Sequence, residues 1–317
     1  MNYQELSRDD LLIKIAELYY LEGLSQQEIA NMIHTSRSNV ARFLKMCVDE
    51  GVVEFKINKQ SSTALEVQNV LERQFRLQKV LIVSSASSPE QVKSRVGAAT
   101  AEYLDSIVRD NCLIGLSWGT TLYQTVRHYN PQRIRRADVI QFVGGIGSKC
   151  IDTDGQDIVK RLQAHFDGTG YVLHAPMIVQ NNVLKQMLME QPDIKSHFEK
   201  FHKTDIAVIG IGSTRSNTSA AYRAGHISKQ EADDMLRHGA IGDLCGTQID
   251  VEGRICETAL TGRVIGVPLE TLLAIPVRIG CACGPDKTNP ILGALRGGYV
   301  NVLVTDEETG RKLVEIT

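Results

Sequence analysis

The sequence predicts an α/β protein built of two parts: an N-terminal, mainly helical winged helix-turn-helix, and a C-terminal doubly wound domain with a mostly parallel sheet. Three observations lead to this prediction. Residues 8–50 place apolar side chains at helical spacing around a tight turn. From residue 79 onward, short apolar runs alternate with helix-like segments. The length of 317 residues also favours two domains over one.

Composition narrows the class of protein. Hydrophobic residues make up 43% of the chain, which fits a sizeable core, and the net charge of −2 excludes a polycation. Seven cysteines without small-domain spacing favour reduced thiols. No apolar run approaches the roughly 20 residues of a membrane span, and the first residues do not resemble a signal peptide. We therefore expect a cytoplasmic protein that does not enter a membrane.

The first elements form a three-helix core. Residues 8–22 carry a broad apolar stripe and predict a bracing helix. A second helix over residues 25–32 follows, with Ser25 as N-cap and Glu28 closing a capping box. The turn at residues 33–35 has His34 where such turns usually carry Gly, and His tolerates positive φ better than most residues.

The third helix, over residues 36–50, predicts a DNA-reading surface. Val40, Phe43, Leu44 and Cys47 mark its inner face. Its outer face has the residue types that contact base edges and phosphates when a helix end enters a major groove. The alternative is a helical hairpin with an ordinary solvated face. With the residues before it, the predicted DNA-binding set is Gln26, Thr35, Ser36, Arg37, Ser38, Asn39, Arg42 and Lys45.

The charge around this surface is unusual for a nucleic-acid binder. The first 58 residues hold six Lys and Arg against nine Asp and Glu, a net charge of −3. Binding to DNA must then depend on a local basic surface, repeated in a dimer or higher oligomer that supplies enough phosphate contacts.

Beyond the third helix the sequence predicts a strand over residues 52–57, as one side of a wing, and a polar hinge at 58–62. A helix over 63–75 either pairs with the same helix of a second copy of the chain or packs on the next domain. These features give domain bounds of 1–58 for the winged helix-turn-helix, 59–78 for a linker and spacer helix, and 79–317 for the larger domain.

The larger domain is predicted as parallel strands joined by crossover helices. The strands are expected at residues 80–84, 112–117, 139–143, 206–211, 279–283 and 300–304. The helices are expected at residues 89–107, 120–128, 157–166, 182–189, 228–238 and 290–295. Residues 244–256 are read instead as a hairpin around Glu252 and Gly253.

Glycines and hydroxyls at the ends of the predicted strands indicate a ligand site, because open α/β sheets bind ligands beyond the carboxyl ends of their strands. Small residues and hydroxyls at a helix N-terminus favour a phosphate. Each stretch alone also fits a tight turn, but three in one sheet favour a phosphorylated small ligand. The residues are Ser117, Gly119, Thr120, Thr121, Gly144, Gly145 and Gly212.

Two charged residues complete the predicted site. Asp243 is expected in a short loop, where it either accepts hydrogen bonds from sugar hydroxyls or caps a turn. Lys287 follows a strand and either pairs with a phosphate or carboxylate or is a solvated loop lysine.

Metal binding is disfavoured. Cys281 and Cys283 lack further ligands at zinc-like spacing. Asp152, Asp154 and Asp157 lack the other ligands of a calcium loop, and helix capping by Asp157 explains them more simply. We expect no metal and no cofactor.

Taken together, the motifs resemble the SorC family of bacterial sugar-responsive transcriptional regulators across essentially the whole chain. They are Leu18-Tyr19-Tyr20, Leu24 to Ala30, Ser36-Arg37, Gly115 to Thr121, Gly144-Gly145, Gly242 to Cys245 and Leu292 to Leu295. The resemblance implies a DNA-binding domain, and an effector-binding and oligomerisation domain that is similar in fold to sugar-phosphate isomerases and deaminases. It also implies a dimer of dimers that regulates a carbohydrate-utilisation operon.

The resemblance further implies a role for each motif residue. Thr120 and Thr121 would bind the phosphate, Gly144-Gly145 would line the site, Asp243 would hold sugar hydroxyls, and Lys287 would close the pocket. Val143 occupies the position of an imine-forming lysine in deoxyribonucleoside regulators, so a covalent imine at this position is excluded. A phosphorylated sugar or polyol, bound non-covalently, is the effector that we expect.

The other function compatible with this fold is a sugar-phosphate isomerase or deaminase with an accessory N-terminal domain. Such chemistry needs a positioned general base and acid near the sugar carbonyl. Asp243 is one candidate, and the motifs offer no partner for it. We therefore expect a regulator and not an enzyme, with operator DNA and a phosphorylated sugar as its partners.

Overall fold

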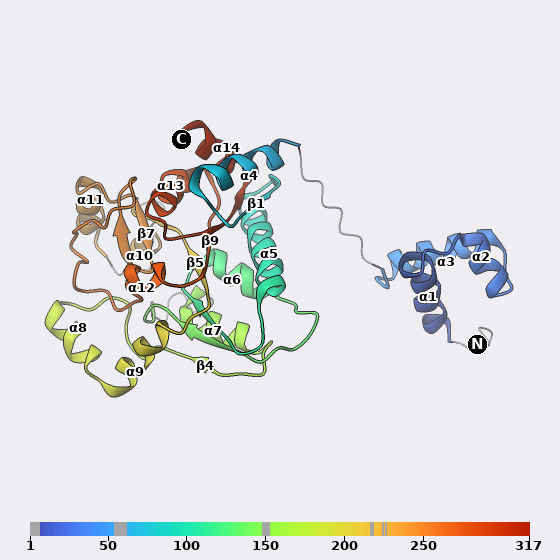
Figure 1. Ribbon diagram of the computed structural model, residues 1–317, viewed down its shortest axis with the longest axis horizontal. Helices are drawn as coiled ribbons and strands as arrows, with labels where there is room; N and C mark the ends of the chain where they lie inside the picture. The colour runs from blue at the N-terminus through green and yellow to red at the C-terminus, as the bar shows by residue number, and fades with distance from the viewer. Residues whose placement is uncertain (1–6, 54–61, 148–152, 216–218, 224, 226) are drawn as a thin grey trace. The chain divides into compact units, whose positions relative to one another are not determined.

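The structure is a computed structural model that describes residues 7–53, 62–147, 153–215, 219–223, 225 and 227–317 (Figure 1). Contacts divide the chain into two compact units, Met1–Lys59 and Gln60–Thr317. In the described residues, no helix is both long enough and apolar enough to cross a membrane.

The first unit is a bundle of three helices. They are α1 (Arg8–Ala16) with a π-helical extension, η2 (Glu17–Leu21), then α2 (Gln26–Met32) and α3 (Arg37–Asp49). Buried Ile15, Leu18, Ile29, Ala30 and Val40 fill the space between them. Since Ala30 presents only a methyl group, α2 and α3 can approach closely at this point.

Both helix starts are capped, and the predicted capping box of Ser25 and Glu28 is confirmed. Ser25 Oγ accepts a hydrogen bond from the N–H of Glu28, whose carboxylate accepts one from the N–H of Ser25. Ser36 caps α3 by accepting from the N–H of Asn39. His34 has a φ of +54°, which confirms that it takes the glycine position of the turn.

The predicted wing strand is wrong at its first two residues. Val52 and Val53 lie in a turn and bend that ends α3, where the N–H of Val53 donates to the carbonyl of Cys47. The rest of this prediction, 54–57, lies outside the described residues, as does most of the predicted hinge.

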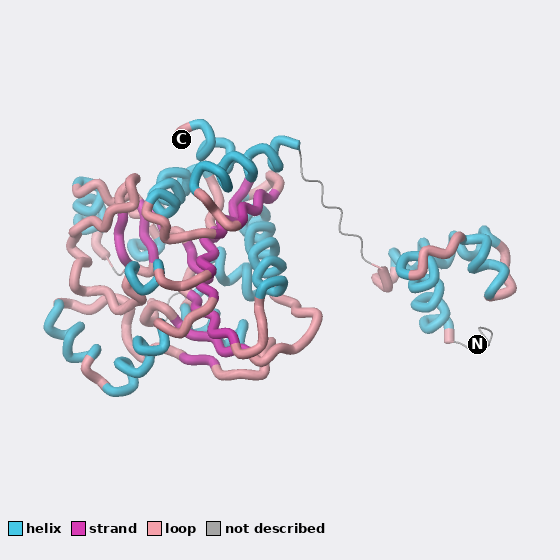
Figure 2. The backbone as a smooth tube through the Cα atoms, viewed as in Figure 1, coloured by secondary structure: helices cyan, strands magenta, loops and turns pink. Residues whose placement is uncertain are grey.

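The second unit contains a seven-stranded, wholly parallel sheet with the order β1-β10-β9-β5-β2-β3-β4. Figure 2 shows these strands running through the middle of the unit between layers of helix. The strands are β1 (Lys79–Val83), β2 (Cys112–Leu116), β3 (Ala137–Gln141), β4 (Gly170–Tyr171), β5 (Ile206–Gly210), β9 (Val277–Cys281) and β10 (Val302–Asp306).

Helices cover both faces of this sheet, as a doubly wound fold requires. One apolar cluster joins the sheet to α5 (Pro89–Ile107), α6 (Thr120–His128) and α7 (Gly155–Gln163). A second cluster lies on the other face and includes α4 (Ser62–Phe75), α12 (Leu269–Leu273), α13 (Thr288–Arg296) and α14 (Glu307–Glu315). The remaining helices are α8 (Asn182–Met189), α9 (Pro192–Phe201), α10 (Ala220–Arg223) and α11 (Lys229–Arg237), with the short 3-10 turn η4 (Pro285–Lys287).

A small antiparallel sheet stands beside the large one. It pairs β6 (Gly212–Ser213), β7 (Gly242–Leu244) and β8 (Thr247–Ile249) in that order. The turn predicted at Glu252 and Gly253 is confirmed, but the hairpin of the small sheet is a different one, in which β7 and β8 are joined at Cys245 and Gly246. Both turn residues have positive φ, +52° and +88°. A second turn does occur at Gly253, closed by a bridge between Ile249 and Ile255.

Three further predictions need correction. The strands β3, β9 and β10 lie two residues away from their predicted positions, and α9, α12 and α14 have no counterpart in the prediction. Asp154, not Asp157, caps α7 by accepting from the N–H of Gln156, and Asp157 instead pairs with Arg161. Residue 152 lies outside the described residues.

Of the two placements weighed for the helix at 63–75, packing on the larger domain is observed, because Val67 and Leu71 are buried in its core.

Candidate functional site

The outer face of α3 presents the predicted DNA-binding residues. Ser36, Arg37, Ser38, Arg42 and Lys45 are exposed. Gln26, Thr35 and Asn39 are half-buried at the junction of α2 with α3.

Hydrogen bonds organise the start of this helix. The Asn39 side chain donates to Thr35 Oγ1 at 3.0 Å, and the hydroxyls of Ser36 and Ser38 lie 3.0 Å apart. These contacts fix the polar residues in front of α3 before any ligand arrives. Asn39 would have to exchange its bond with Thr35 for one with a base if it reads DNA directly.

The cations of α3 are available for phosphates. Among the described residues, Arg37, Arg42 and Lys45 form no ion pair, and the guanidinium of Arg42 stacks over the Phe43 ring at 5.6 Å. Arg8, on α1, is instead paired with Glu50. Among the described residues of the first unit, the cations without an ion pair therefore lie on α3.

The second predicted site lies at the carboxyl edge of the large sheet, around the start of α6. Gly119 is the N-cap residue, with a φ of +118° that disfavours any side chain, and no side chain caps the helix. Thr120 and Thr121 form the first turn, one exposed and one half-buried. An uncapped helix start with two hydroxyls is suited to an anion. Ser117 is buried nearby, and its Oγ accepts from the N–H of Gly210 at 3.1 Å, which ties β2 to β5.

The paired glycines serve packing. The N–H of Gly144 donates to the carbonyl of Ile265, and that of Gly145 donates to the carbonyl of Ala175. A Cβ on Gly144 would lie 2.6 Å from the backbone of Ala175 and Pro176. The side on which a Gly144 side chain would project is thus filled by another segment of the chain, and the approach of a ligand to Gly144 and Gly145 stays a prediction.

Gly212 has a similar role, because a Cβ there would lie 2.9 Å from the Cβ of Asp243. Asp243 itself lies in strand β7, not in the predicted loop, and pairs with Gly212 across the small sheet. Its carboxylate accepts from the N–H of Gly246 at 3.3 Å and from Gln248 Nε2 at 3.0 Å. These bonds fix its orientation and leave lone pairs for further donors.

Asp243 and Lys287 influence each other electrostatically. Burial raises the pKa of the Asp243 carboxyl, although hydrogen bonds and the charge of Lys287 act against this rise. Burial also lowers the pKa of Lys287 to about 8, although Asp243 acts against this fall. Among the described residues, the Lys287 ammonium has no hydrogen bond and no ion pair within 4 Å, so its charge is not neutralised locally.

Two further cations belong to this edge and were not predicted. Arg223, on α10, and Lys93, on α5, both lower the pKa of Lys287 by their charge. Neither Arg223 nor Lys93 belongs to a glycine-rich strand end or to a motif of recurring spacing, which are the features that identified the other candidate residues. The only signal for Lys93 was its place near the start of a helix that follows a predicted strand.

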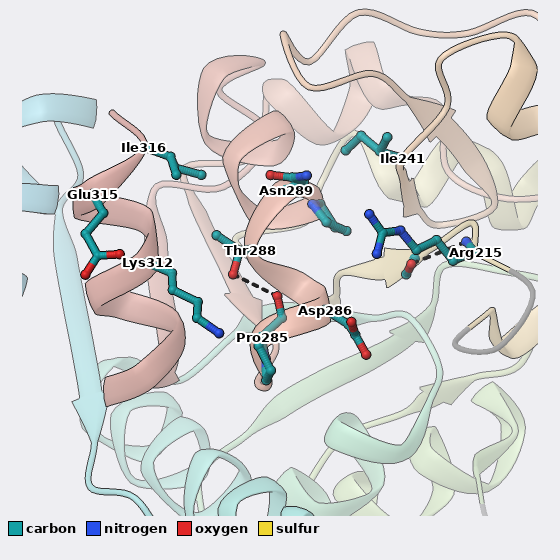
Figure 3. Close-up of a pocket in the computed structure, with 11 residues that line it drawn as sticks. Arg215, Ile241, Pro285, Asp286, Thr288, Asn289, Lys312, Glu315 and Ile316 are labelled. Atoms are coloured by element: carbon teal, nitrogen blue, oxygen red, sulfur yellow. Dashed lines mark hydrogen bonds between the residues drawn. The ribbon is translucent and has the colours of Figure 1, made fainter.

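A surface pocket of about 220 Å³ lies beside the site (Figure 3). The pocket is lined by residues that flank the site, and none of the predicted effector residues lines it. Charges of both signs surround it, and its Lys312 is already paired with Glu308. Its lining is Ser213, Arg215, Ile241, Pro285, Asp286, Thr288, Asn289, Pro290, Lys312, Glu315 and Ile316.

The cysteines near this edge have separate environments. Cys281 is buried and its thiol donates to the carbonyl of Ile209 at 3.5 Å. Burial raises the pKa of Cys283 to about 11, so it is a thiol at neutral pH. Across the part of the chain that the structure describes, no group of three His, Cys, Asp or Glu side chains is arranged to hold a metal ion.

Comparison with known proteins assigns the same two parts. Residues 59–315 match a putative sugar-binding domain, and residues 16–54 match a winged helix-turn-helix DNA-binding domain. A deoxyribonucleoside regulator of Bacillus subtilis is 31% identical over 97% of this chain and 98% of its own length. A sorbitol operon regulator of Klebsiella pneumoniae is 28% identical over 96% and 98%. The crystal structure of the full-length sorbitol operon regulator SorC from that organism superposes with a TM-score of 0.90 at 26% identity, covering 98% of this chain and all of the other.

The fold and the two sites thus define a transcriptional regulator with a DNA-binding domain and a sugar-binding domain. The chain belongs to the SorC family.

Proposed function

We propose that this protein regulates a carbohydrate-utilisation operon in response to a phosphorylated sugar or polyol that binds non-covalently at the carboxyl edge of its large sheet. The observation that carries the proposal is the pairing of an uncapped helix start at Thr120 and Thr121 with the un-neutralised ammonium of Lys287. Both groups favour a phosphate, one by its N–H groups and dipole and the other by its charge.

The sugar itself would be held by Asp243. A carboxylate fixed by Gly246 and Gln248 is oriented to accept hydrogen bonds from hydroxyl groups. Two relatives are named for a deoxyribonucleoside and for sorbitol, which supports a sugar or polyol of five or six carbons. Buried Val143 supports non-covalent binding, because it supplies no amine.

The regulatory response would act through the binding of α3 to operator DNA. Because the first 58 residues carry a net charge of −3, we propose that a dimer of dimers provides the phosphate contacts that one copy lacks. The protein would act in the cytoplasm and would not be an enzyme. The names of the relatives, which are all regulators, support this choice.

A thermal-shift screen of the full-length protein tests the proposal. The probes are sorbitol 6-phosphate, fructose 6-phosphate and deoxyribose 5-phosphate, each with its unphosphorylated parent. A phosphorylated probe at 100 times its Kd is expected to stabilise the protein by about 2.7 kcal/mol. Monitoring the probe for conversion separates a sensor from an isomerase. Turnover of the stabilising probe, or stabilisation only by unphosphorylated sugars, would reject the proposal.

The pH dependence of effector binding provides a second test. The Lys287 pKa of about 8 means that the free protein carries this charge below pH 8 and loses it above. A bound phosphate, already doubly charged in this range, raises that pKa. Affinity is therefore expected to fall by up to about tenfold per pH unit above pH 8. The measurement is the Kd of the stabilising probe between pH 7 and 9.5.

Lys287→Arg is the matched control for this measurement. Its guanidinium stays charged throughout the range, so the Kd should change little with pH. Asp243, Cys283, Arg223 and Lys93 also face this lysine and remain in the variant. If Lys287→Arg loses affinity as steeply as the wild type, another group is titrating and Lys287 does not hold the phosphate.

A further inference from the structure

Lys93 is a half-buried lysine that the proposed function does not use. It lies in the second turn of α5, which begins beyond the carboxyl end of β1 and contacts β9 and β10. Among the described residues, its ammonium makes no hydrogen bond and no ion pair. The methylenes of a lysine can cover apolar surface while its ammonium stays free to meet a ligand.

The surroundings of Lys93 show where its charge acts. It lowers the pKa of Lys287 and also that of Cys283, so the two ammonium groups act on the same thiol. α5 is in turn fixed to α6, because a Cβ on Gly97 would lie 2.5 Å from the Cβ of Gln124. The helix that carries Lys93 is thus held against the helix that starts at Thr120.

The carboxylates nearby are already engaged. Asp306 accepts from the N–H of Gly284 at 2.7 Å and from both the N–H and the hydroxyl of Thr309. Asp243 accepts from Gly246 and Gln248. Neither forms an ion pair within 4 Å with Lys93 or Lys287 in the part of the chain that the structure describes. Lys93 and Lys287 therefore lie at this edge together with Arg223, and among the described residues neither lysine has a carboxylate in direct contact.

Charge matching indicates the ligand group that belongs there. A phosphate monoester carries between −1.5 and −2 charges at neutral pH. Two ammonium groups balance it, whereas a carboxylate balances only one and a free sugar or polyol balances none. Burial of Lys287 strengthens this preference, because its desolvated charge is repelled by that of Lys93 and is stabilised when an anion binds.

We propose that Lys93 is a further effector-binding residue that holds the phosphate together with Lys287 and makes the site select phosphorylated over free sugars. This inference rests on the proposed function of the carboxyl edge. It adds a binding residue from α5, an element that carries none of the predicted effector residues.

The test compares Lys93→Met, Lys93→Arg and Lys185→Met with the wild type in the full-length chain. Lys185 is a half-buried lysine of α8 that also makes no hydrogen bond or ion pair among the described residues, so it matches the change in charge and volume. The probes are inorganic phosphate and the phosphorylated sugar that stabilises the wild type, each measured by thermal shift and calorimetry. Lys93→Met is expected to weaken both by about tenfold or more. Lys93→Arg should retain most of the affinity, and Lys185→Met should match the wild type.

Two different failures are distinguishable. If the wild type binds a phosphorylated sugar and Lys93→Met binds it equally well, this inference is rejected while the proposed function stands. If neither inorganic phosphate nor any phosphorylated sugar stabilises the wild type, the proposed function is rejected and this inference with it. Equal weakening by Lys93→Met and Lys185→Met would show a general charge effect and would also overturn the assignment.

Discussion

Arg37→Ala is expected to lower the affinity of the full-length protein for its operator by about 30-fold or more. Each bidentate contact with a base contributes roughly 1–3 kcal/mol, and a dimer makes the contact twice. Arg37 is the first residue of α3, exposed and without an ion pair among the described residues. In helix-turn-helix proteins, residues at this end of the recognition helix reach the base edges. The measurement is a gel-shift titration against an operator selected from random duplexes with the wild-type protein.

The control must remove a charge from the same unit without changing the N-terminal end of α3. Arg8→Ala does so, since Arg8 lies on α1 and pairs with Glu50. Its operator affinity should stay within a few-fold of the wild type. Both variants should keep the wild-type thermal shift with the effector, because that site lies in the other unit. Operator binding by Arg37→Ala at wild-type affinity would show that α3 is not the recognition helix.

The DNA-binding unit was the most predictable part of this chain because local interactions determine it. Ser25 and Glu28 close their capping box within four residues, and His34 takes the positive-φ position within one turn. Such features are visible in the sequence, since donor and acceptor are neighbours along the chain. The wing was less predictable, as Val52 and Val53 alternate like a strand but end α3 in a turn.

In the larger unit, the presence of six strands and their parallel direction followed from the pattern, but the exact bounds of several strands, their order in the sheet and several helices did not. Apolar residues continue past strand ends, as at Phe142 and Val143 after β3, so the apolar run does not mark where pairing stops. Helix α14 was missed because small residues form its buried face. Thr309 and Gly310 are buried there, and a Cβ on Gly310 would press on Val67 and Ile82.

The candidate effector site shows why residue types alone predict too many ligand contacts. Glycines are needed both where a ligand approaches the backbone and where another segment does, and the sequence does not separate these cases. Gly144 and Gly212 belong to the second case. Asp243 was predicted from its place in a short stretch before a hairpin, whereas the proposed Lys93 lies on a helix that is distant from it in sequence.

Asp243→Ala is expected to leave operator binding intact and to raise the effector concentration needed to release DNA by at least about 100-fold. Each hydrogen bond to a charged group typically contributes about 1.5–3 kcal/mol, and a sugar offers several hydroxyls to this carboxylate. Thr121→Val removes a predicted phosphate donor and should act in the same direction. The measurement is operator release, by fluorescence anisotropy, as a function of the stabilising probe from the thermal-shift screen.

Two companion variants separate lost contacts from lost structure. Asp243→Asn keeps the shape, and its one amide oxygen can still accept from Gly246 or from Gln248, although not from both. A poor response with an unchanged melting temperature then assigns the effect to the carboxylate.

Asp286→Ala removes a nearby carboxylate that lines the surface pocket in Figure 3, and it should respond as the wild type does. Because coupling between effector and operator is reciprocal, variants that lose the response should also bind the effector equally well with and without DNA. Release at the wild-type probe concentration in both Asp243→Ala and Thr121→Val would place the effector elsewhere.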